Sequence, residues 1–472
     1  MTSWANSGSR DLHLDLSSVL RPGARGVREL LTTALRDAVR SGRLAVDTTL
    51  PPARSLAADL GLARNTVAEA YAALVAEGWL ASRQGSGTWV VNGGNRSPTV
   101  QPRGTAGTPT HNLLPGSPDV SAFPRSQWLA SARRALTSAP NAALRLGDPR
   151  GRPELREALA EYLGRTRGVR ASPESIMVCA GTRHSVELLA KTFGAARPIA
   201  VEVDALFVFR ETIASVGAAT APIGLDELGA RVDDLERLDT PAALITAAHQ
   251  YPHGVPLDPA RRTAIISWAR RTGGYVIEDD YDGEFRYDRQ PIGALQGLDP
   301  DRVVYLGSVS KTLSPALRLG WMVLPDDLLD AVIATAGGEQ FYVNSIDQLT
   351  MADFIVTGRY DRHVRRMRAS YRRRREILVA AMSGFDVGIS GVPAGLHLLL
   401  TLPVGAEQTV LRRAAEAGVA LAGLARLRHP LAAADAPQRD GVVINFGTPA
   451  DHEFAGAVGA ICHVLRASGL AG

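Results

Sequence analysis

Lysine is almost absent from this chain. Among the 52 lysines and arginines in 472 residues, only Lys191 and Lys311 are lysine. The chain therefore uses arginine wherever a plain positive charge is needed. An arginine guanidinium stays protonated and cannot form an imine with an aldehyde, whereas a lysine amine can. A lysine that is kept in such a sequence points to imine chemistry.

Cysteine and long apolar runs are also scarce. Cys179 and Cys462 stand far apart, which argues against a disulfide framework and a cysteine metal site, and we predict no metal site. No run approaches the ~20 apolar residues of a membrane-spanning helix. Residues 1–10 lack the apolar core of a signal peptide. We therefore expect a cytoplasmic protein without a membrane partner.

Neither sign of charge is in large excess. The formal net charge is +4, and residues 1–95 contain ten Arg against eight Asp and Glu. Such a chain can bind nucleic acid, but its bulk charge does not argue for it. Any contact with DNA must come from where the arginines are placed.

The segment around Lys311 has the pattern of a strand followed by a turn. Residues 303–306 are apolar and mostly β-branched or aromatic, which predicts a buried strand. The lysine follows that strand and is expected at the carboxyl edge of a sheet, where open α/β folds bind ligands. Ser308 and Ser310 can donate to phosphate oxygens, and Arg318 can clamp them. The alternative is a surface lysine in a serine-rich loop.

Two further predicted strands end in polar residues. Residues 176–180 form one of them, and Gly181 and Thr182 then open a helix, an arrangement that favours anion binding. Residues 275–278 form the other, followed by Asp279 and Tyr281. Asp279 and Lys311 are 32 residues apart, a βαβ spacing that places both in one crevice. An ordinary tight turn and a solvated acidic loop are the respective alternatives.

Residues 1–91 have the element order of a winged helix-turn-helix. Helices are predicted over 26–40, 51–61 and about 65–77, followed by short strands around a Gly-Ser-Gly tip. The third helix of such a motif enters the major groove of double-stranded DNA, while neighbouring residues contact phosphates. The predicted DNA contacts are Arg54, Ser55, Arg64, Asn65, Thr66, Arg83, Gly85 and Gly87. A protein-interaction module with solvated arginines is the alternative.

Residues 92–112 are rich in Gly, Pro, Ser and Thr without periodicity, which predicts a flexible linker. Residues 113–472 are then the second domain, with a large part over about 145–345 and a small part over about 346–472. A long basic helix from Arg359 is expected to join the two parts, with its arginines on a solvated face. A second surface for the DNA backbone is the alternative.

Segments of this chain resemble two known protein families. Residues 50–57 (Leu-Pro-Pro-Ala-Arg-Ser-Leu-Ala) and 64–71 (Arg-Asn-Thr-Val-Ala-Glu-Ala-Tyr) resemble the GntR regulators. The Lys311 segment resembles the pyridoxal-phosphate (PLP) lysine of fold-type I aminotransferases. Together they resemble the MocR subfamily, which implies an α+β winged helix-turn-helix followed by an α/β PLP-dependent transferase body with a small α+β C-terminal domain. Head-to-tail homodimers bound to operator DNA are implied as well.

The same resemblance assigns roles around PLP. Lys311, the catalytic lysine of the family, forms the imine, Asp279 keeps the ring nitrogen protonated, and Tyr281 donates to the phenolic oxygen. The phosphate is assigned to Ser308, Ser310, Arg318, Gly181 and Thr182.

The chain departs from the family at several positions. Leu146 and Leu206 stand where tyrosines are usual, and Tyr251 stands where aminotransferases have an asparagine. Phe207 could replace the ring missing at 206. The arginine that grips a substrate carboxylate is missing near Val442 and Val443, and Arg426, Arg428 and Arg439 are the candidates nearby. Without a fixed clamp the substrate is not held for reaction, so efficient turnover is not expected.

Four hypotheses follow. The first is a PLP-holding transcriptional regulator, without enzymatic turnover beyond residual or half-transamination, that responds to PLP or an amino compound. The second is an active aminotransferase that carries a DNA-binding module. The third is a regulator of vitamin B6 synthesis that senses PLP itself. The fourth is a degenerate body that binds no PLP.

Overall fold

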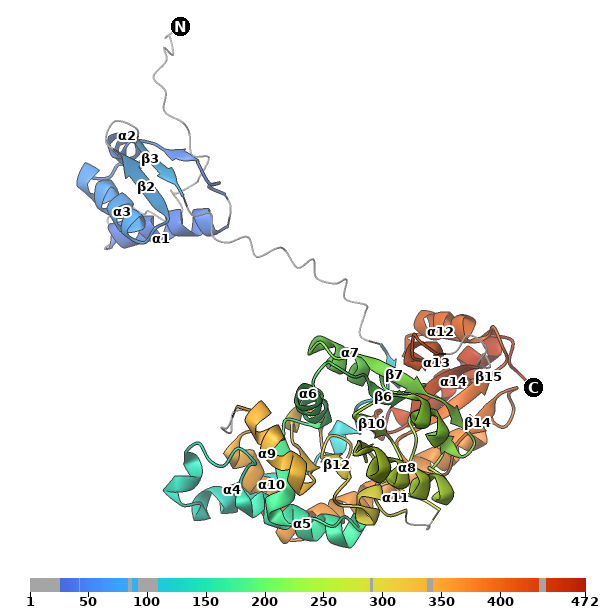
Figure 1. The fold of residues 1–472 in the computed structure, drawn as a ribbon. Coiled ribbons are helices and arrows are strands. Elements are labelled where there is room, and N and C mark those ends of the chain that lie inside the picture. The colour runs from blue at the N-terminus through green and yellow to red at the C-terminus, as the bar shows by residue number, and fades with distance from the viewer. Residues whose placement is uncertain are drawn as a thin grey trace. The chain divides into compact units, whose positions relative to one another are not determined.

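The computed structural model describes residues 26–41, 43–83, 87–91, 109–288, 292–337, 343–432 and 439–472. The chain forms two compact units, Met1–Thr108 and Pro109–Gly472 (Figure 1). Residues 92–108 of the predicted linker lie outside the described residues. His111–Asn112 form strand β4, which pairs in parallel with β16 (Val419–Ala420). The end of the predicted linker therefore belongs to the body.

The N-terminal unit confirms the predicted winged helix-turn-helix. Its helices are α1 (Val27–Arg40), α2 (Ala53–Leu60) and α3 (Arg64–Ala76), and its strands are β1 (Thr49–Leu50), β2 (Leu80–Arg83) and β3 (Gly87–Val90). The strands form an antiparallel sheet in the order β1-β3-β2. Gly61 ends α2 in the left-handed conformation, with φ 64°, so the chain turns sharply into α3. Apolar residues from every element share one core, including Leu31, Leu35, Val67, Leu74 and Val90.

A seven-stranded sheet is the centre of the body. Its order is β5 (Ile176–Cys179), β13 (Gly320–Val323), β12 (Val303–Ser308), β11 (Tyr275–Asp279), β10 (Ala242–Ile245), β6 (Ile199–Glu202) and β7 (Thr220–Ile223). Only β13 runs antiparallel to its neighbours. The carboxyl ends of β5, β6, β10, β11 and β12 therefore lie at the same edge.

Helices cover both faces of this sheet, because alternate strand residues point to opposite sides. Tyr305 and Trp321 pack on one face, against α5 (Pro153–Arg167) and α10 (Ser345–Val356). Leu306 and Met322 pack on the other face, against α6 (Thr182–Phe193), α7 (Phe207–Ser215) and α9 (Asp326–Thr335). Burial on both faces explains why these strands read as continuous apolar runs. Helices α4 (Arg125–Ser138) and α8 (Pro259–Thr272) complete this large part.

The small part is an α+β unit, as predicted. Its sheet has the order β14 (Gly388–Ser390), β15 (His397–Leu402), β18 (Asp440–Asn445) and β17 (Ala422–Gly423), with helices α12 (Glu407–Glu416), α13 (Leu424–Leu427) and α14 (Phe454–Ala467). Helix α11 (Arg359–Met382) joins the two parts (Figure 1). Its first turns pack with the large part through Tyr360 and Val364, and its later turns pack with the small part through Tyr371 and Leu378. The packing thus changes from one part to the other inside α11 rather than near residue 345.

Candidate functional site

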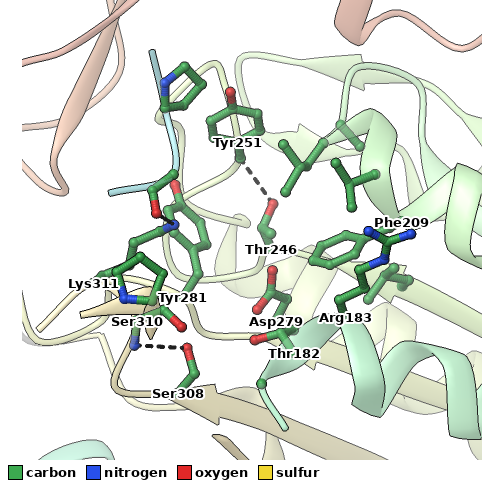
Figure 2. Close-up of a pocket in the computed structure, with 18 of the residues that line it drawn as sticks. Thr182, Arg183, Phe209, Thr246, Tyr251, Asp279, Tyr281, Ser308, Ser310 and Lys311 are labelled. Carbon is green, nitrogen blue, oxygen red and sulfur yellow. Dashed lines mark hydrogen bonds between the residues drawn. The ribbon is translucent and has the colours of Figure 1, made fainter. Parts of the chain in front are cut away.

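A cavity of about 330 Å³ lies where the strand ends converge (Figure 2). Each of the five parallel strand ends supplies lining residues, because consecutive loops leave the same sheet edge. The structure brings together all eight residues predicted for a cofactor: Gly181, Thr182, Asp279, Tyr281, Ser308, Ser310, Lys311 and Arg318. The remaining walls come from α7 and from the small part, which supplies Leu396, His397 and Asn445.

Lys311 follows β12 and points its amine into this cavity. Its Nζ donates to the carbonyl oxygen of Gly116 at 2.9 Å. Burial lowers the pKa of Lys311, and the nearby carboxyls of Asp279 and Asp282 oppose that shift. A lowered pKa increases the fraction of neutral amine, the form that attacks an aldehyde.

Asp279 ends β11 and is only 5% exposed. Its Oδ1 is buried and has no hydrogen-bond partner among the described residues. Burial raises the pKa of Asp279 to about 8, and the charge of Lys311 opposes this rise. A buried carboxyl oxygen without a donor is costly. The N–H of a pyridinium ring would supply the missing donor, so this carboxyl fits the ring nitrogen of PLP.

Another wall of the cavity is suited to phosphate. Gly181 and Thr182 line the cavity at the start of α6, where the first turn of a helix has backbone N–H groups without helical partners. A Cβ on Gly320 would lie 2.9 Å from the Gly181 Cα, and a Cβ on Gly181 would lie 3.8 Å from Arg318 Nη1. The turn therefore lies close to both the sheet and the arginine. The Ser308 hydroxyl accepts from Ser310 N at 3.4 Å and lines the same wall.

Two tyrosines stand between the strand ends and the small part. The Tyr281 hydroxyl donates to the carbonyl oxygen of His249 at 3.1 Å. The Tyr251 ring meets the Tyr281 ring edge-on, with 6.1 Å between centroids. The buried Tyr251 hydroxyl has no partner among the described residues. Tyr251 thus supplies a ring wall at the position where aminotransferases have an amide.

The described residues among the predicted DNA contacts lie on four elements of the N-terminal unit. Arg54 and Ser55 stand in the first turn of α2, while Arg64, Asn65 and Thr66 form the first turn of α3. Arg83 ends β2, and Gly87 begins β3 with φ 89°. Gly85 lies outside the described residues. The described arginines among them are exposed, as contact with phosphates requires.

Comparison with known proteins agrees with both units. The model of the bacterial regulatory proteins of the gntR family matches residues 28–90, and the model of the class I and II aminotransferases matches residues 118–424. The probable rhizopine catabolism regulatory protein MocR of Rhizobium meliloti is 33% identical over 83% of this chain and 85% of its own length. This chain belongs to the MocR-type regulators of the GntR family.

Two further similarities support this assignment. The pyridoxine biosynthesis transcriptional regulator PdxR of Corynebacterium glutamicum is 32% identical over 78% of this chain and 82% of that protein. The crystal structure of an archaeal alanine:glyoxylate aminotransferase superposes with a TM-score of 0.69 at 22% identity, covering 76% of this chain and 91% of that one. The body therefore has the fold of the PLP-dependent aminotransferases. Among the described residues, no helix is long and apolar enough to cross a membrane.

One residue suggested from the MocR resemblance is misplaced. Phe207 does not line the cavity, because α7 begins there and its ring lies under Arg426, with 4.1 Å from the guanidinium carbon to the ring centroid. Leu206 and Phe209 line the cavity instead, and Phe209 is labelled in Figure 2. Phe207 and Phe209 are two residues apart in α7, about 200° around the helix axis, so their side chains point to opposite sides of it.

None of the three candidate carboxylate arginines lines the cavity. Arg426 lies over Phe207, and Arg428 lies 3.5 Å from Asp204. Arg439 is exposed. Val443 packs in an apolar cluster with Tyr251, Leu399, Leu424 and Leu427. The usual place of the carboxylate clamp is therefore apolar.

Several cavity residues escaped the sequence analysis, namely Glu202, Thr246, Arg183, Arg210 and His397. Glu202 ends β6 and Thr246 follows β10, so the rule that predicted Asp279 could have found them. The Thr246 hydroxyl donates to Glu202 at 2.7 Å, and burial raises the pKa of Glu202 to about 7. The other three come from helices and from the small part. Their positions depend on packing, which no local pattern reveals.

Replacement of Arg64 by alanine is expected to weaken binding to operator DNA by about 5- to 150-fold, the effect of losing ~1–3 kcal/mol of base contact. Arg28 is the matched control. It lies in α1, 3.8 Å from Glu69, and is not among the predicted contacts. Fluorescence anisotropy with labelled promoter DNA would measure both variants. Equal losses for the two would contradict the assignment of the α3 terminus.

Proposed function

We propose that this transcriptional regulator holds PLP as an imine on Lys311, and that PLP or an amino compound bound there changes the affinity of the protein for operator DNA. The observation that carries the proposal is the pairing of Lys311 with the unpartnered buried carboxyl of Asp279 across one cavity. An amine for the aldehyde and an acceptor for the ring nitrogen are the two groups PLP needs. When bound, PLP supplies an electron-withdrawing ring.

The remaining residues position the ligand. Thr182, Ser308, Ser310 and Arg318 supply donors for the phosphate, and Tyr281 supplies a hydroxyl for the phenolic oxygen. Tyr251 and Leu206 close the cavity with apolar surface. One wall of the cavity is therefore polar and another is apolar, which matches the charged phosphate and the aromatic ring of PLP.

A ligand bound in this cavity would affect the small part through residues at which the large and small parts are hydrogen-bonded to each other. Ala205 N donates to Leu427 O at 3.3 Å, and His429 N donates to Val203 O at 2.7 Å. Arg210 also donates to Leu427 O, at 2.7 Å. Residues that line the cavity are thus tied to the end of α13. Regulation requires that ligand bind two arrangements of these parts unequally.

Catalysis is the weaker candidate function. The usual position of the carboxylate clamp is apolar around Val443, so an amino acid would lack the anchor that aminotransferases have there to orient it for reaction. Residual or half-transamination remains compatible with Lys311 and Asp279. Steady release of a keto acid from any amino donor would favour a working aminotransferase.

Sensing of PLP itself is favoured by the relative PdxR, whose name refers to pyridoxine biosynthesis. A site without the usual carboxylate clamp suits a ligand that has no amino acid part. Anisotropy titrations of promoter DNA with and without PLP, in the absence of any amine, would decide. DNA affinity that is identical at all PLP concentrations would overturn a PLP sensor, and an added requirement for an amino compound would favour the amine-responsive form.

A homodimer is supported by an exposed apolar surface on α4 and the turn after it. Leu129, Leu136, Leu144 and Leu146 are 51–71% exposed. Four exposed leucines within residues 129–146 are more than the single scattered apolar residues of an ordinary surface, and exposed apolar patches mark protein interfaces. We propose that a second copy of the chain covers it, and Leu146 would then lie in the interface.

Replacement of Leu136 by aspartate is therefore expected to convert the dimer largely to monomer, because burying an unpaired carboxylate costs several kcal/mol. Sedimentation velocity at micromolar concentration would measure the change. Val404→Asp is the control, since Val404 is 72% exposed and lies in the small part. A Leu136→Asp protein that remains dimeric would contradict this interface.

A further inference from the structure

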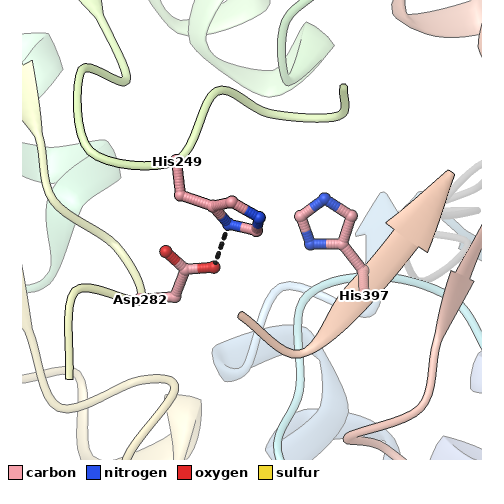
Figure 3. A group of neighbouring side chains, drawn as sticks. All are labelled: His249, Asp282 and His397. Carbon is pink, nitrogen blue, oxygen red and sulfur yellow. Dashed lines mark hydrogen bonds and ion pairs between the residues drawn. The ribbon is translucent and has the colours of Figure 1, made fainter. Parts of the chain in front are cut away.

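A buried hydrogen-bonded group lies next to Tyr281. It consists of the His249 ring, the Asp282 carboxylate and the Tyr281 hydroxyl, and we call it the Tyr281 support. His249 Nδ1 lies 2.8 Å from Asp282 Oδ2, and the two side chains are 4% and 2% exposed. The Tyr281 hydroxyl lies 3.1 Å from the same Nδ1. Figure 3 shows the bond between His249 and Asp282, with His397 on the other side of the imidazole ring.

The chemistry of these groups fixes the direction of the bonds. A carboxylate accepts, so His249 Nδ1 carries the hydrogen and donates it to Asp282. That nitrogen cannot then accept from Tyr281, and the hydroxyl donates to the His249 carbonyl oxygen at 3.1 Å. Burial raises the pKa of Tyr281 well above its ordinary value. The phenol therefore keeps its proton and remains a donor.

Close packing fixes the imidazole. A Cβ on Gly254 would lie 3.1 Å from His249 Nε2, and a Cβ on Gly395 would lie 2.6 Å from His249 Cε1. The ring centroid of His397 is 5.3 Å from that of His249. Neighbouring backbone therefore leaves the His249 ring little room to move. The bond to Asp282 is thus a preorganised feature of the fold.

His249, Asp282 and His397 also offer donor atoms within 4.8 Å of one another. Their arrangement suits hydrogen bonding better than an ion. Asp282 lies on the Nδ1 side of His249 and His397 on the opposite side (Figure 3). Ligands of a zinc ion must converge on one point at about 2.0–2.2 Å. The 2.8 Å bond to Asp282 already uses the His249 nitrogen on that side.

We propose that His249 and Asp282 are positioning residues that hold the Tyr281 hydroxyl for the phenolic oxygen of PLP, and so set the pH response of the loaded site. This inference rests on the proposed binding of PLP. The Tyr281 oxygen stays in place while its hydrogen turns toward the ligand. The single Nδ1–H of His249 lies 2.8 Å from Asp282 Oδ2 and 3.1 Å from the Tyr281 oxygen, so it is then shared between these two acceptors and supports that oxygen.

The sign of the effect follows from electrostatics. A donor to the phenolic oxygen favours its negative form, so the donor lowers the proton affinity of the oxygen and of the imine beside it. A misplaced Tyr281 hydroxyl therefore raises the pH at which the loaded site loses its proton. The other titratable or charged groups that face this site are Asp279, Glu202, Tyr251, Lys311, His397, Arg183, Arg210 and Arg318. They are unchanged in every variant of the pH titration below.

The test is a pH titration of the visible absorbance of the PLP-loaded, full-length protein. Tyr281→Phe sets the full effect, an upward shift of the midpoint by about one to two units, since a hydrogen bond to a charged group is worth ~1.5–3 kcal/mol and one pKa unit corresponds to ~1.4 kcal/mol. His249→Leu removes the ring donor and is expected to raise the midpoint of the titration by most of the shift seen in Tyr281→Phe. His249→Asn keeps an N–H near the position of Nδ1 and is expected to stay close to wild type. His253→Gln, in the same loop, is the control because its ring bonds Asp204 instead.

A His249→Leu midpoint equal to wild type, with Tyr281→Phe shifted, would overturn the role of the support. A shift of the same size in His253→Gln would overturn it as well, by showing a general effect of the loop. Zn²⁺ alone could instead bind tightly to the ligand-free protein, with the binding lost in His397→Ala. That result would overturn the positioning role and show that His249, Asp282 and His397 form a metal site. A wild-type protein that shows no visible band with PLP contradicts the proposed function itself, which separates the two failures.

Discussion

Lys311→Ala is expected to abolish the absorbance band at about 420 nm that an imine of PLP gives. Borohydride treatment of the wild type should fix PLP to one peptide, the peptide containing residue 311. The chain offers an unusually clean control, because Lys191 is its only other lysine. Lys191 lies on α6 and pairs with Glu187 at 2.7 Å. Lys191→Ala should keep both the band and the label.

The result matters beyond cofactor binding. DNA affinity of Lys311→Ala should no longer respond to PLP, while its affinity without PLP should equal that of the wild type, because the N-terminal unit has its own core. A variant that still shows the band, or a label found on Lys191, would contradict the assigned lysine.

Asp279→Asn is expected to change PLP affinity and ligand-free stability in opposite directions. Loss of the charged acceptor should weaken PLP binding by about 10- to 100-fold, since such a bond is worth ~1.5–3 kcal/mol. Without ligand, burial raises the pKa of this carboxyl from 3.8 to about 8. The folded protein then holds a proton that the unfolded chain has lost, so the contribution of Asp279 to stability falls as pH rises through this window.

The asparagine variant lacks this pH-dependent cost. Its ligand-free melting temperature should exceed that of the wild type at pH 8 by about 1–3 °C, whereas the difference should shrink near pH 4. Differential scanning fluorimetry at both pH values, with and without PLP, measures all four cases. Asp299→Asn is a control, because this buried carboxylate already receives a bond from Arg270 at 2.7 Å. A destabilised Asp279→Asn protein at pH 8 would show that the carboxyl has a donor in solution.

The site residues that the sequence predicted are those whose position follows from the residues next to them in the chain. A buried apolar run that ends in Gly181, Asp279 or Ser308 predicts both a strand and the edge where its last residue lies. Because β5, β11 and β12 run in the same direction, three local predictions meet in one cavity. The wing and the third helix of the N-terminal unit were predictable for the same reason, since Gly61 precedes that helix, Gly78 follows it, and glycines mark the tip of the wing.

Other residues depend on contacts between distant segments. Whether Phe207 or Phe209 faces the cavity depends on the residue at which α7 begins. Phe209 faces it because Phe209 packs in one cluster with Val201 of β6 and Leu244 of β10. The pairing of His249 with Asp282 joins loops after two adjacent strands, across 33 residues of sequence. Neither residue has a pattern of its own.

The sequence alone determined the two-domain plan, the strand ends that carry Lys311 and Asp279, and the loss of a carboxylate clamp near Val443, because each depends on neighbouring residues along the chain. Only the tertiary structure decided which side chains enclose the cavity, that Asp279 lacks a donor, and that His249 supports Tyr281. Those properties come from burial and from contacts between strands and loops, which folding creates and a linear pattern does not contain.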